Sequence, residues 1–275
     1  MKGIYDCEVV AQSCVAPGVM RTILTGAEIA RNSVPGQFVN VRVCETSDPL
    51  LRRPFSVHAV YPDEGLYSLL YVLVGKGTQL LSKVQPGIKL SVVGPLGNGF
   101  DLGEDPEEEH VVVAGGCGAA PLHFLAAKLC EKWGCGKVTV LCGAQTKKSL
   151  LCQAEFESFG GEVSVSTDDG TSGYHGTVTG LLEDFLADRD PKNVRVYSCG
   201  PHPMLKRVAE VSGSGGVKLC QVSLENHMSC GVGVCLGCVQ KIRGAFRGDE
   251  SGQGWHHERV CKEGPVFDAE DVIWE

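Results

Sequence analysis

Apolar residues in the first hundred positions come in short runs separated by turn-forming residues. Runs with the length and composition of strands occupy residues 5–10, 19–24, 37–43, 55–61, 66–74 and 89–93. Gly, Pro and Asp interrupt them at Pro35-Gly36, at residues 62–65 and at Pro86-Gly87. Short strands with regularly spaced turns are typical of a small antiparallel barrel. We therefore predict an antiparallel β-barrel domain over residues 1–101.

The pattern changes after residues 101–109, an acidic stretch with one proline that we interpret as a linker. Buried-strand candidates at 110–114, 137–142, 161–167 and 194–199 alternate with helical stretches at 122–133, 149–159 and 178–186. This alternation predicts βαβ units around a parallel sheet. We predict an α/β domain over residues 108–219. Residues 220–275 are rich in Gly and Cys with little periodicity, and we expect a small separate module there.

Composition narrows the class of protein. The 275 residues suffice for about two domains of roughly 100–200 residues each. A net charge of −8 argues against nucleic acid as the main partner, because phosphate binding needs a basic surface. No apolar run approaches the roughly 20 residues of a membrane span, and the first residues lack the apolar core of a signal peptide. We expect a cytoplasmic protein whose 14 cysteines are thiols or metal ligands rather than disulfides.

The most specific chemical signal is a group of four cysteines near the C-terminus: Cys230, Cys235, Cys238 and Cys261. The first three form C-x4-C-x2-C, and 22 residues separate the third from the fourth. This is the plant-type ferredoxin spacing for a [2Fe–2S] cluster. Glycines within the loop let its backbone fold around an anionic core and direct N–H groups at the sulfurs.

Structural zinc is the main alternative for these cysteines, since sites of four cysteines also bind Zn²⁺. Such sites are usually built from two C-x2-C pairs, whereas here three cysteines share one loop, and we favour iron–sulfur. His256 and His257 lie near the fourth cysteine in sequence and could suggest Rieske-type ligation. With four cysteines available, we interpret the two histidines as part of a solvated loop.

Two motifs in the barrel region suggest a flavin nucleotide. In Arg53-Pro54-Phe55-Ser56, the guanidinium would fit a pyrophosphate and the Ser56 hydroxyl could bond a flavin nitrogen. The alternative is an ordinary strand with a surface arginine. Gly75-Lys76-Gly77-Thr78 resembles a phosphate-binding turn that opens a helix, or a plain turn with Thr78 as N-cap.

Two further motifs follow predicted strands of the α/β domain. Gly115-Gly116 begins a Gly-rich turn that would let a dinucleotide approach the backbone. Cys199-Gly200 follows another strand, at the edge where open α/β sheets bind ligands, and its thiol could lie near a nicotinamide. Both could equally be turns that bind nothing. Thr167–Gly170 is similar, either beside a ribose or in a solvated turn.

Together the motifs resemble the ferredoxin–NADP reductase superfamily, in order and over nearly the whole chain. The tail, with Ser223-Leu224-Glu225, the cysteine loop and the segment 260–267, is similar to electron-transfer subunits of the NAD-dependent, class B dihydroorotate dehydrogenases. The resemblance implies a flavin/iron–sulfur oxidoreductase subunit of pyrimidine biosynthesis, with FAD in the barrel, NAD(H) in the α/β domain and [2Fe–2S] in the tail. It implies an FMN-containing catalytic partner, two of each subunit assembling.

The resemblance also suggests residue roles. Arg53 would hold the FAD pyrophosphate, Gly77 and Thr78 its phosphates, and the stretch Leu70, Tyr71 and Val72 would lie along the flavin. No side chain need act as a catalytic acid or base, because the protein positions redox groups. The chain alone would then oxidise NADH with artificial acceptors but not dihydroorotate.

Two rival functions stay open at this point. One is the subunit of a different redox complex, such as an NADPH-linked ferredoxin oxidoreductase or a sulfite reductase. The other is a non-catalytic zinc module on a degenerate reductase fold. One departure from the family pattern is visible, because the segment 239–260 between the third and fourth cysteines is longer than usual. We interpret its polar part, residues 243–259, as a surface loop extension.

Overall fold

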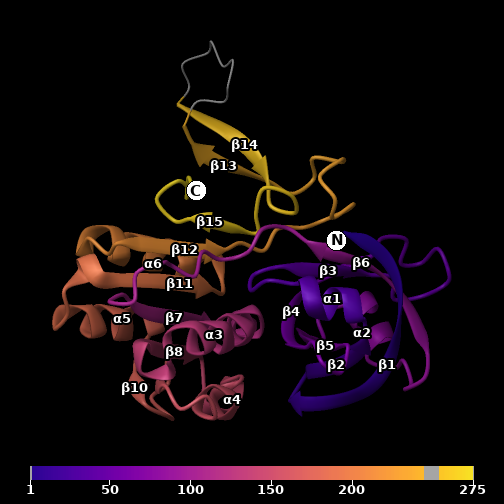
Figure 1. Cartoon of the computed structure of the whole chain (residues 1–275), viewed down its shortest axis with the longest axis horizontal. Helices are drawn as coiled ribbons and strands as arrows, with labels where there is room; N and C mark the ends of the chain where they lie inside the picture. Colours follow the sequence, from indigo (N-terminus) through magenta and orange to yellow (C-terminus); the bar gives the residue numbers. More distant parts are fainter. Residues whose placement is uncertain (1, 245–253, 275) are drawn as a thin grey trace.

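The computed structural model describes residues 2–244 and 254–274, in two lobes with a C-terminal segment above both (Figure 1). The first lobe is a closed antiparallel barrel in the order β1-β2-β5-β4-β3-β6. Its strands are β1 (Gly3–Ala16), β2 (Val19–Thr25), β3 (Phe38–Val41), β4 (Arg53–Tyr61), β5 (Leu66–Val72) and β6 (Lys89–Leu96). Two short helices, α1 (Ala27–Asn32) and α2 (Lys76–Leu81), accompany them. The predicted barrel is confirmed.

The second lobe is a seven-stranded sheet in the order β10-β9-β8-β7-β11-β12-β15, parallel except for β15. Its strands are β7 (Glu109–Gly115), β8 (Val138–Ala144), β9 (Glu162–Thr167), β10 (Tyr174–His175), β11 (Val194–Cys199), β12 (Leu219–Ser223) and β15 (Val266–Asp268). The helices are α3 (Ala119–Trp133), α4 (Gln153–Glu157), α5 (Val178–Ala187) and α6 (His202–Gly215). Chain order reverses beside β7, and such a switch point is where open α/β sheets bind ligands.

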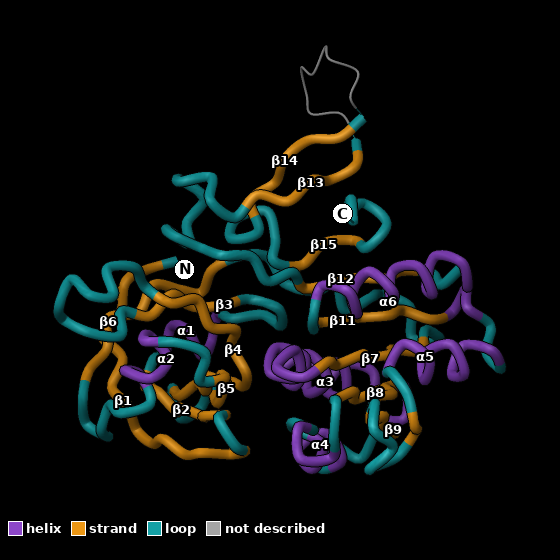
Figure 2. Tube along the Cα trace, turned by 180° about the vertical axis from the view of Figure 1, so that it is seen from behind, coloured by secondary structure: helices purple, strands orange, loops and turns teal. Residues whose placement is uncertain are grey.

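The helices cover the sheet because their apolar faces match its Val-rich strands. Leu122, Leu125 and Leu129 of α3 pack into one core with Val112 and Val140. The opposite face of the sheet is covered by α5 and α6 (Figure 2). The sheet therefore has the two buried faces that purely apolar parallel strands require.

The two ends of the acidic linker are tied to the sheet, whereas residues 104–107 between them are exposed. Glu108 is 1% exposed and pairs with Arg195 at 2.6 Å and with Lys218 at 2.6 Å. Arg195 also contacts Asp101 at 3.0 Å. These ion pairs hold the start of β7 against β11 and β12, and so fix the connection between the two lobes.

Three features differ from the pattern-based expectations. The helix expected at 149–159 is only α4, because Leu150 is extended and Cys152 adopts a left-handed conformation with φ 60°. The tail, expected to be irregular, contributes β12 and β15 to the large sheet, so that sheet continues past residue 219. The expected loop extension begins and ends as a β-hairpin, β13 (Val239–Arg243) and β14 (Trp255–Arg259). Residues 245–253, within that extension, lie outside the described residues.

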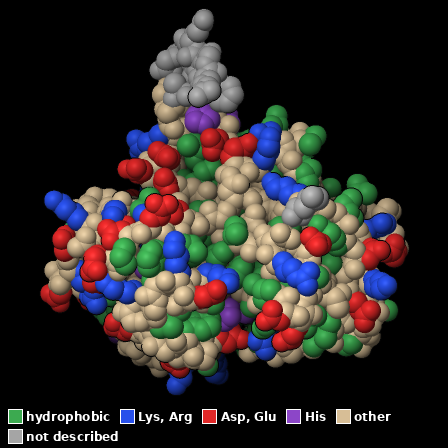
Figure 3. Space-filling view, viewed as in Figure 1, with side chains coloured by type: hydrophobic (Ala, Val, Ile, Leu, Met, Phe, Trp, Pro, Cys, Tyr) green, Lys and Arg blue, Asp and Glu red, His purple; other side chains and the backbone are tan. Residues whose placement is uncertain are grey.

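Surface charge is mixed. Lys, Arg, Asp and Glu side chains are spread over the outer parts of both lobes on the face shown in Figure 3. No described helix has both the length and the apolar character needed to cross a membrane.

Candidate cofactor sites

A cavity of about 790 Å³ lies between the barrel and the α/β domain. This volume is within the range of sites that bury cofactor-sized ligands. Its walls come from the barrel, the β7–α3 turn and the segment that leads from β12 into the cysteine loop. The lining residues are Phe38, Pro54, Phe55, Ser56, Leu70, Tyr71, Val72, Val74, Thr78, Cys117, Ala120, Pro121, Ser223, Leu224, Glu225, Asn226, His227, Met228, Gly237 and Pro265.

Seven of the residues predicted to contact a flavin nucleotide line this cavity. They lie on β4, on β5 and at the start of α2: Pro54, Phe55, Ser56, Leu70, Tyr71, Val72 and Thr78. Strands β4 and β5 are neighbours in the barrel, which places the two stretches side by side although the sequence separates them. The rings of Phe55 and Tyr71 stand 5.1 Å apart, and the Tyr71 hydroxyl lies 3.3 Å from Thr22 Oγ1. These contacts stiffen the aromatic part of the wall.

Arg53 and Gly77 lie beside the cavity without lining it. A Cβ on Gly77 would come within 2.6 Å of Arg53 Nε, so the guanidinium lies over the first turn of α2. Thr78 is the third residue of that helix and not its N-cap, which is Gly75. The Thr78 hydroxyl accepts hydrogen bonds from the N–H groups of Val74 and Gly75 at 3.0 and 3.2 Å. The arginine, the glycine and the threonine are thus brought together at one end of the cavity.

The two turns predicted for the α/β domain meet at the carboxyl edge of the sheet. Ala114 and Cys199 are paired in adjacent strands, so Gly115 and Gly116 lie next to Gly200. A Cβ on Gly118 would be 2.0 Å from the Cys199 carbonyl oxygen, so only glycine permits this approach. None of the four predicted residues Gly115, Gly116, Cys199 and Gly200 lines the cavity.

Cys117, which lies within the predicted Gly-rich turn but was given no role in the site, is at the cavity wall. Burial, with the Glu225 carboxylate as a second cause, raises the pKa of its thiol to about 11. The Cys199 thiol is 1% exposed, and burial raises its pKa well above the ordinary range. Burial therefore favours the neutral thiol over the thiolate at both positions.

The segment after β12 supplies polar groups to which the sequence analysis gave no role in the site, although it quoted Glu225 as part of the family resemblance. Glu225, Asn226 and His227 all line the cavity. Burial raises the pKa of the Glu225 carboxyl. A signal was available, since three consecutive polar residues, 225–227, lie between the strand that ends at Ser223 and the cysteine loop. Only the fold shows that they line the cavity.

The cysteine loop presents backbone N–H groups to its sulfurs. Cys230 Sγ accepts from Val232, Val234 and Cys235 at 3.5, 3.4 and 3.5 Å. Desolvation opposes these bonds, yet together they lower the pKa of the Cys230 thiol to about 6. Gly231 and Gly233 have φ of 70° and 82°, the left-handed region that glycine adopts without strain. The loop is therefore built to hold an anion.

The four cysteines form two pairs. The Cys235 N–H reaches Cys230 Sγ, and the Cys261 N–H reaches Cys238 Sγ at 3.4 Å. The thiols of each pair are hydrogen-bonded to one another. In a [2Fe–2S] cluster each iron takes two thiolates, so two pairs match its ligand set.

A zinc site is a poorer match to the same sulfurs. Four cysteines around one zinc would place every pair of sulfurs about 3.8 Å apart, given Zn–S bonds of about 2.3 Å. Within the described chain, ligand atoms of three such residues lie mutually within 4.8 Å only at His58, Cys152 and Glu155. His256 and His257 belong to the hairpin, where His256 bonds Gly244 O and Glu258.

The cysteine loop also reaches the cavity. Gly237, between the second and third cysteines, is part of the cavity wall, as is Pro265 a few residues after the fourth. Asn40 Nδ2 on β3 donates to the Cys230 carbonyl at 3.2 Å, and Asn98 Nδ2 donates to the Glu263 carbonyl at 2.7 Å. The loop is thus fixed against the barrel, directly beside the residues expected to hold a flavin.

Comparisons with known proteins agree with this geometry. Residues 225–273 match the family model described as the iron–sulfur cluster binding domain of dihydroorotate dehydrogenase B. Residues 112–210 match the oxidoreductase NAD-binding domain. The chain is 43% identical over 275 residues to the dihydroorotate dehydrogenase B (NAD⁺) electron transfer subunit of Desulforamulus reducens, with both chains covered completely. The subunit of the same name from Geobacillus thermodenitrificans is 40% identical over 274 residues, 99% of this chain and 100% of the relative.

Solved structures share the fold. A structure of an NADH-dependent reduced ferredoxin–NADP oxidoreductase, described in work on flavin-based electron bifurcation, superposes with a TM-score of 0.81 at 30% identity. The match covers 100% of this chain and 92% of that chain. A ferredoxin–NADP⁺ reductase from Neisseria gonorrhoeae with bound FAD and NADP superposes with a TM-score of 0.64 at 16% identity. It covers 78% of this chain and 92% of that one, and shows the shared fold alone.

Proposed function

This chain belongs to the family of electron-transfer subunits of dihydroorotate dehydrogenase B (NAD⁺), and we propose which of its residues carry that function. Its cofactors are FAD, NAD(H) and an iron–sulfur cluster, and it is an oxidoreductase subunit in pyrimidine biosynthesis. The single observation that carries the proposal is the shared cavity. One wall holds the predicted flavin residues, and another holds Gly237 of the cysteine loop.

We assign the flavin site to the barrel side of the cavity. Arg53, placed over the first turn of α2, would bind the pyrophosphate as a charged fork beside Gly77 and Thr78. Ser56 would hydrogen-bond a ring nitrogen, while Leu70, Tyr71 and Val72 would form the surface along the ring. Pro54 and Phe55 complete this wall. The bound flavin would exchange hydride pairs with NAD(H) and single electrons with the cluster.

The nicotinamide nucleotide would bind at the carboxyl edge of the sheet. The two turns there, which contain Gly115, Gly116, Cys199 and Gly200, would let the nucleotide lie close to the protein backbone. Cys117, Ala120 and Pro121 would then border the reacting ring, since these residues extend from the same turn into the cavity. Buried neutral thiols suit this role, because they exclude water without offering a competing nucleophile.

The metal ligands would be Cys230, Cys235, Cys238 and Cys261, two for each iron of a [2Fe–2S] cluster. The N–H groups of Val232, Val234 and Cys235 stabilise negative charge on Cys230, which favours the thiolate over the thiol. The position of Gly237 in the cavity wall supports a short path between cluster and flavin. No side chain need transfer a proton for the cluster to exchange an electron.

A catalytic partner subunit follows from the family, and we propose that it carries FMN and assembles as two of each chain. Apolar side chains around the cysteine loop support a docking surface there: Val232, Val234 and Leu236 are 45%, 79% and 61% exposed. Exposed apolar side chains gathered at a redox site are typical of an interface. We place the subunit in the cytoplasm, where all 14 cysteines could remain free thiols or ligands.

The test is an anaerobic NADH titration of the purified protein, followed by visible absorption and low-temperature EPR. Bleaching flavin bands with a rhombic signal from a reduced [2Fe–2S] cluster would support the proposed path. A colourless, EPR-silent protein that contains zinc would contradict it. Copurification then identifies the partner: an FMN protein that oxidises dihydroorotate is expected, whereas a ferredoxin-linked partner would favour the function named for the 30% identical structure.

A further inference from the structure

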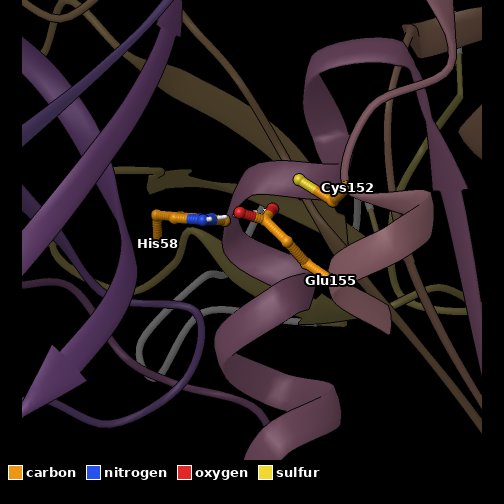
Figure 4. A group of neighbouring side chains, drawn as sticks. All are labelled: His58, Cys152 and Glu155. Atoms are coloured by element: carbon orange, nitrogen blue, oxygen red, sulfur yellow. Dashed lines mark ion pairs between the residues drawn. The ribbon is translucent and has the colours of Figure 1, made fainter. Parts of the chain in front are cut away.

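We propose that His58, Cys152 and Glu155 bind one zinc-class divalent cation at the boundary between the barrel and the α/β domain. Their ligand atoms, an imidazole nitrogen, a thiol sulfur and a carboxylate oxygen, all lie within 4.8 Å of one another. Figure 4 shows His58 extending from the barrel toward the two residues on and before α4, with the sulfur and the carboxylate directed into the same space. The site is separate from the cysteine loop and from the cavity.

Hydrogen bonding leaves the correct nitrogen of His58 available. Its Nδ1 lies 3.1 Å from the Ala120 carbonyl oxygen, which can only accept, so Nδ1 carries the proton. In the neutral ring Nε2 then has its lone pair directed at Glu155 Oε2, 3.8 Å away and beyond hydrogen-bond distance. A histidine ligand that donates its other N–H to a backbone carbonyl is the usual arrangement in metal sites.

Glu155 is oriented by a cation on its other oxygen. Arg21 Nη1 lies 2.6 Å from Oε1, while Oε2 faces His58. An outer hydrogen bond of this kind fixes a ligating carboxylate. The Cys152 thiol is hydrogen-bonded to the same carboxylate, and a metal bound to both groups would replace that bond. The His58 side chain is 2% exposed and that of Glu155 is 36% exposed. A water molecule could therefore complete the coordination from the Glu155 side.

Cys152 has an uncommon backbone conformation, and its sulfur points toward His58 and Glu155. Its φ of 60° is left-handed, and Leu236 is the other described non-glycine residue with positive φ. Such strain concentrates where a side chain is positioned for function. Three mixed ligands with one open position match the preferences of zinc, whose bonds to sulfur, nitrogen and oxygen are about 2.0–2.3 Å. Binding would convert the thiol to a thiolate and release its proton to solvent.

A metal bound at this site would link the barrel to the α/β domain. His58 belongs to β4 of the barrel, whereas Cys152 and Glu155 belong to the α/β domain. A bound metal would fix the orientation of one lobe relative to the other, and this orientation sets the width of the cofactor cavity.

The experiment uses the complete protein, purified anaerobically with its iron retained, and Zn²⁺ as the probe. After equilibrium dialysis against zinc, metal analysis should give one zinc per chain with unchanged iron. X-ray absorption at the zinc edge should show one sulfur with nitrogen and oxygen ligands. Cys152→Ala, His58→Gln and Glu155→Gln should each lower bound zinc at least tenfold. Glu157→Gln, on the same helix, is the matched control and should retain it.

Three results would overturn the proposal. One is wild-type protein that binds no zinc above the Glu155→Gln level. Another is a four-sulfur shell, which would place the zinc on the cysteine loop. The third is equal zinc in Cys152→Ala and Glu157→Gln. Glu155 is partly exposed, so its variant keeps the test decisive if replacing the buried His58 prevents folding. The readouts do not depend on the proposed electron-transfer function.

Discussion

Cysteines in two regions of this protein have opposite chemistry. Cys230, in the loop near the surface, has its thiol pKa lowered to about 6 by backbone N–H groups that outweigh desolvation. Cys142, inside β8, has its thiol pKa raised to about 12 by burial. The residue type is the same, so the difference comes from the backbone donors around the Cys230 sulfur and the burial of the Cys142 sulfur. Backbone donors thus favour the thiolate at Cys230, whereas the core keeps Cys142 a neutral thiol. The contrast does not extend to every proposed ligand, because burial raises the pKa of the Cys261 thiol to about 12 as well.

The largest effect should come from removing one loop cysteine. Cys235→Ala removes one of the two proposed ligands, Cys230 and Cys235, of the first iron. We therefore expect iron content below about a tenth of wild type and loss of the EPR signal. NADH oxidation with an artificial acceptor should persist, because the cavity is intact. Cys14→Ala, which changes an exposed cysteine outside the loop, should keep its iron. A full cluster in Cys235→Ala would contradict the ligand assignment.

The alkylation rates of Cys230 and Cys142 compare the cysteine loop with the core of the sheet directly. In protein stripped of iron at pH 7, Cys230 is mostly thiolate and Cys142 almost entirely thiol. The difference in thiolate fraction, reduced by the lower nucleophilicity of the more acidic thiol, predicts alkylation roughly 10²–10³-fold faster at Cys230. Iodoacetamide labelling with peptide mass analysis measures this ratio. Its rate at Cys230 should fall as the pH drops below 6, and a rate independent of pH would disprove the lowered pKa.

Arg53→Ala tests whether the cavity binds FAD, and it leaves the cysteine loop unchanged. Losing a charged hydrogen bond to phosphate costs about 1.5–3 kcal/mol, which corresponds to FAD affinity roughly 10–100-fold weaker. Flavin fluorescence on dilution reports the released cofactor. Arg53→Lys should recover part of the affinity, since it restores the charge but not the fork. Unchanged FAD affinity in Arg53→Ala would remove this residue from the proposed site.

The smallest effect concerns the meeting of the two turns in the α/β domain. In Gly118→Ala the new Cβ would be 2.0 Å from the Cys199 carbonyl, and overpacking of this kind costs about 1–3 kcal/mol. Thermal unfolding of the cofactor-loaded protein should show a lowered midpoint.

Gly213→Ala is the control for that substitution. Gly213 lies in α6, and apart from its own helix backbone and chain neighbours no atom lies within 4 Å of its added Cβ, so helix propensity should raise stability by up to about 1 kcal/mol. Opposite signs for the two variants are expected. A Gly118→Ala protein as stable as wild type would show that the turns can separate.

The local pattern of apolar and polar residues was enough to predict those helices and strands whose apolar runs are long and bounded by clear turns. The barrel strands and α3 lie close to where their runs predict them. It was insufficient at α4, where Cys152 departs from helical geometry, and at β12 and β15. Those two strands are short, and their apolar faces find partners only across long separations, as in the pairing of Val222 with Phe267. Periodicity within a segment carries no information about such partners.

The sequence by itself determined the chemistry of the cysteine loop, because ligand type and C-x4-C-x2-C spacing are local properties of the chain. It also predicted the residues of β4 and β5 that line the cavity and that we propose as the flavin wall. Only the tertiary structure decided that Cys117, rather than Cys199, borders the cavity, and that Glu225 lines it too. It alone brought His58 to Cys152 and Glu155. Contacts between lobes depend on how folded surfaces fit, and no short stretch of sequence contains both sides of that fit.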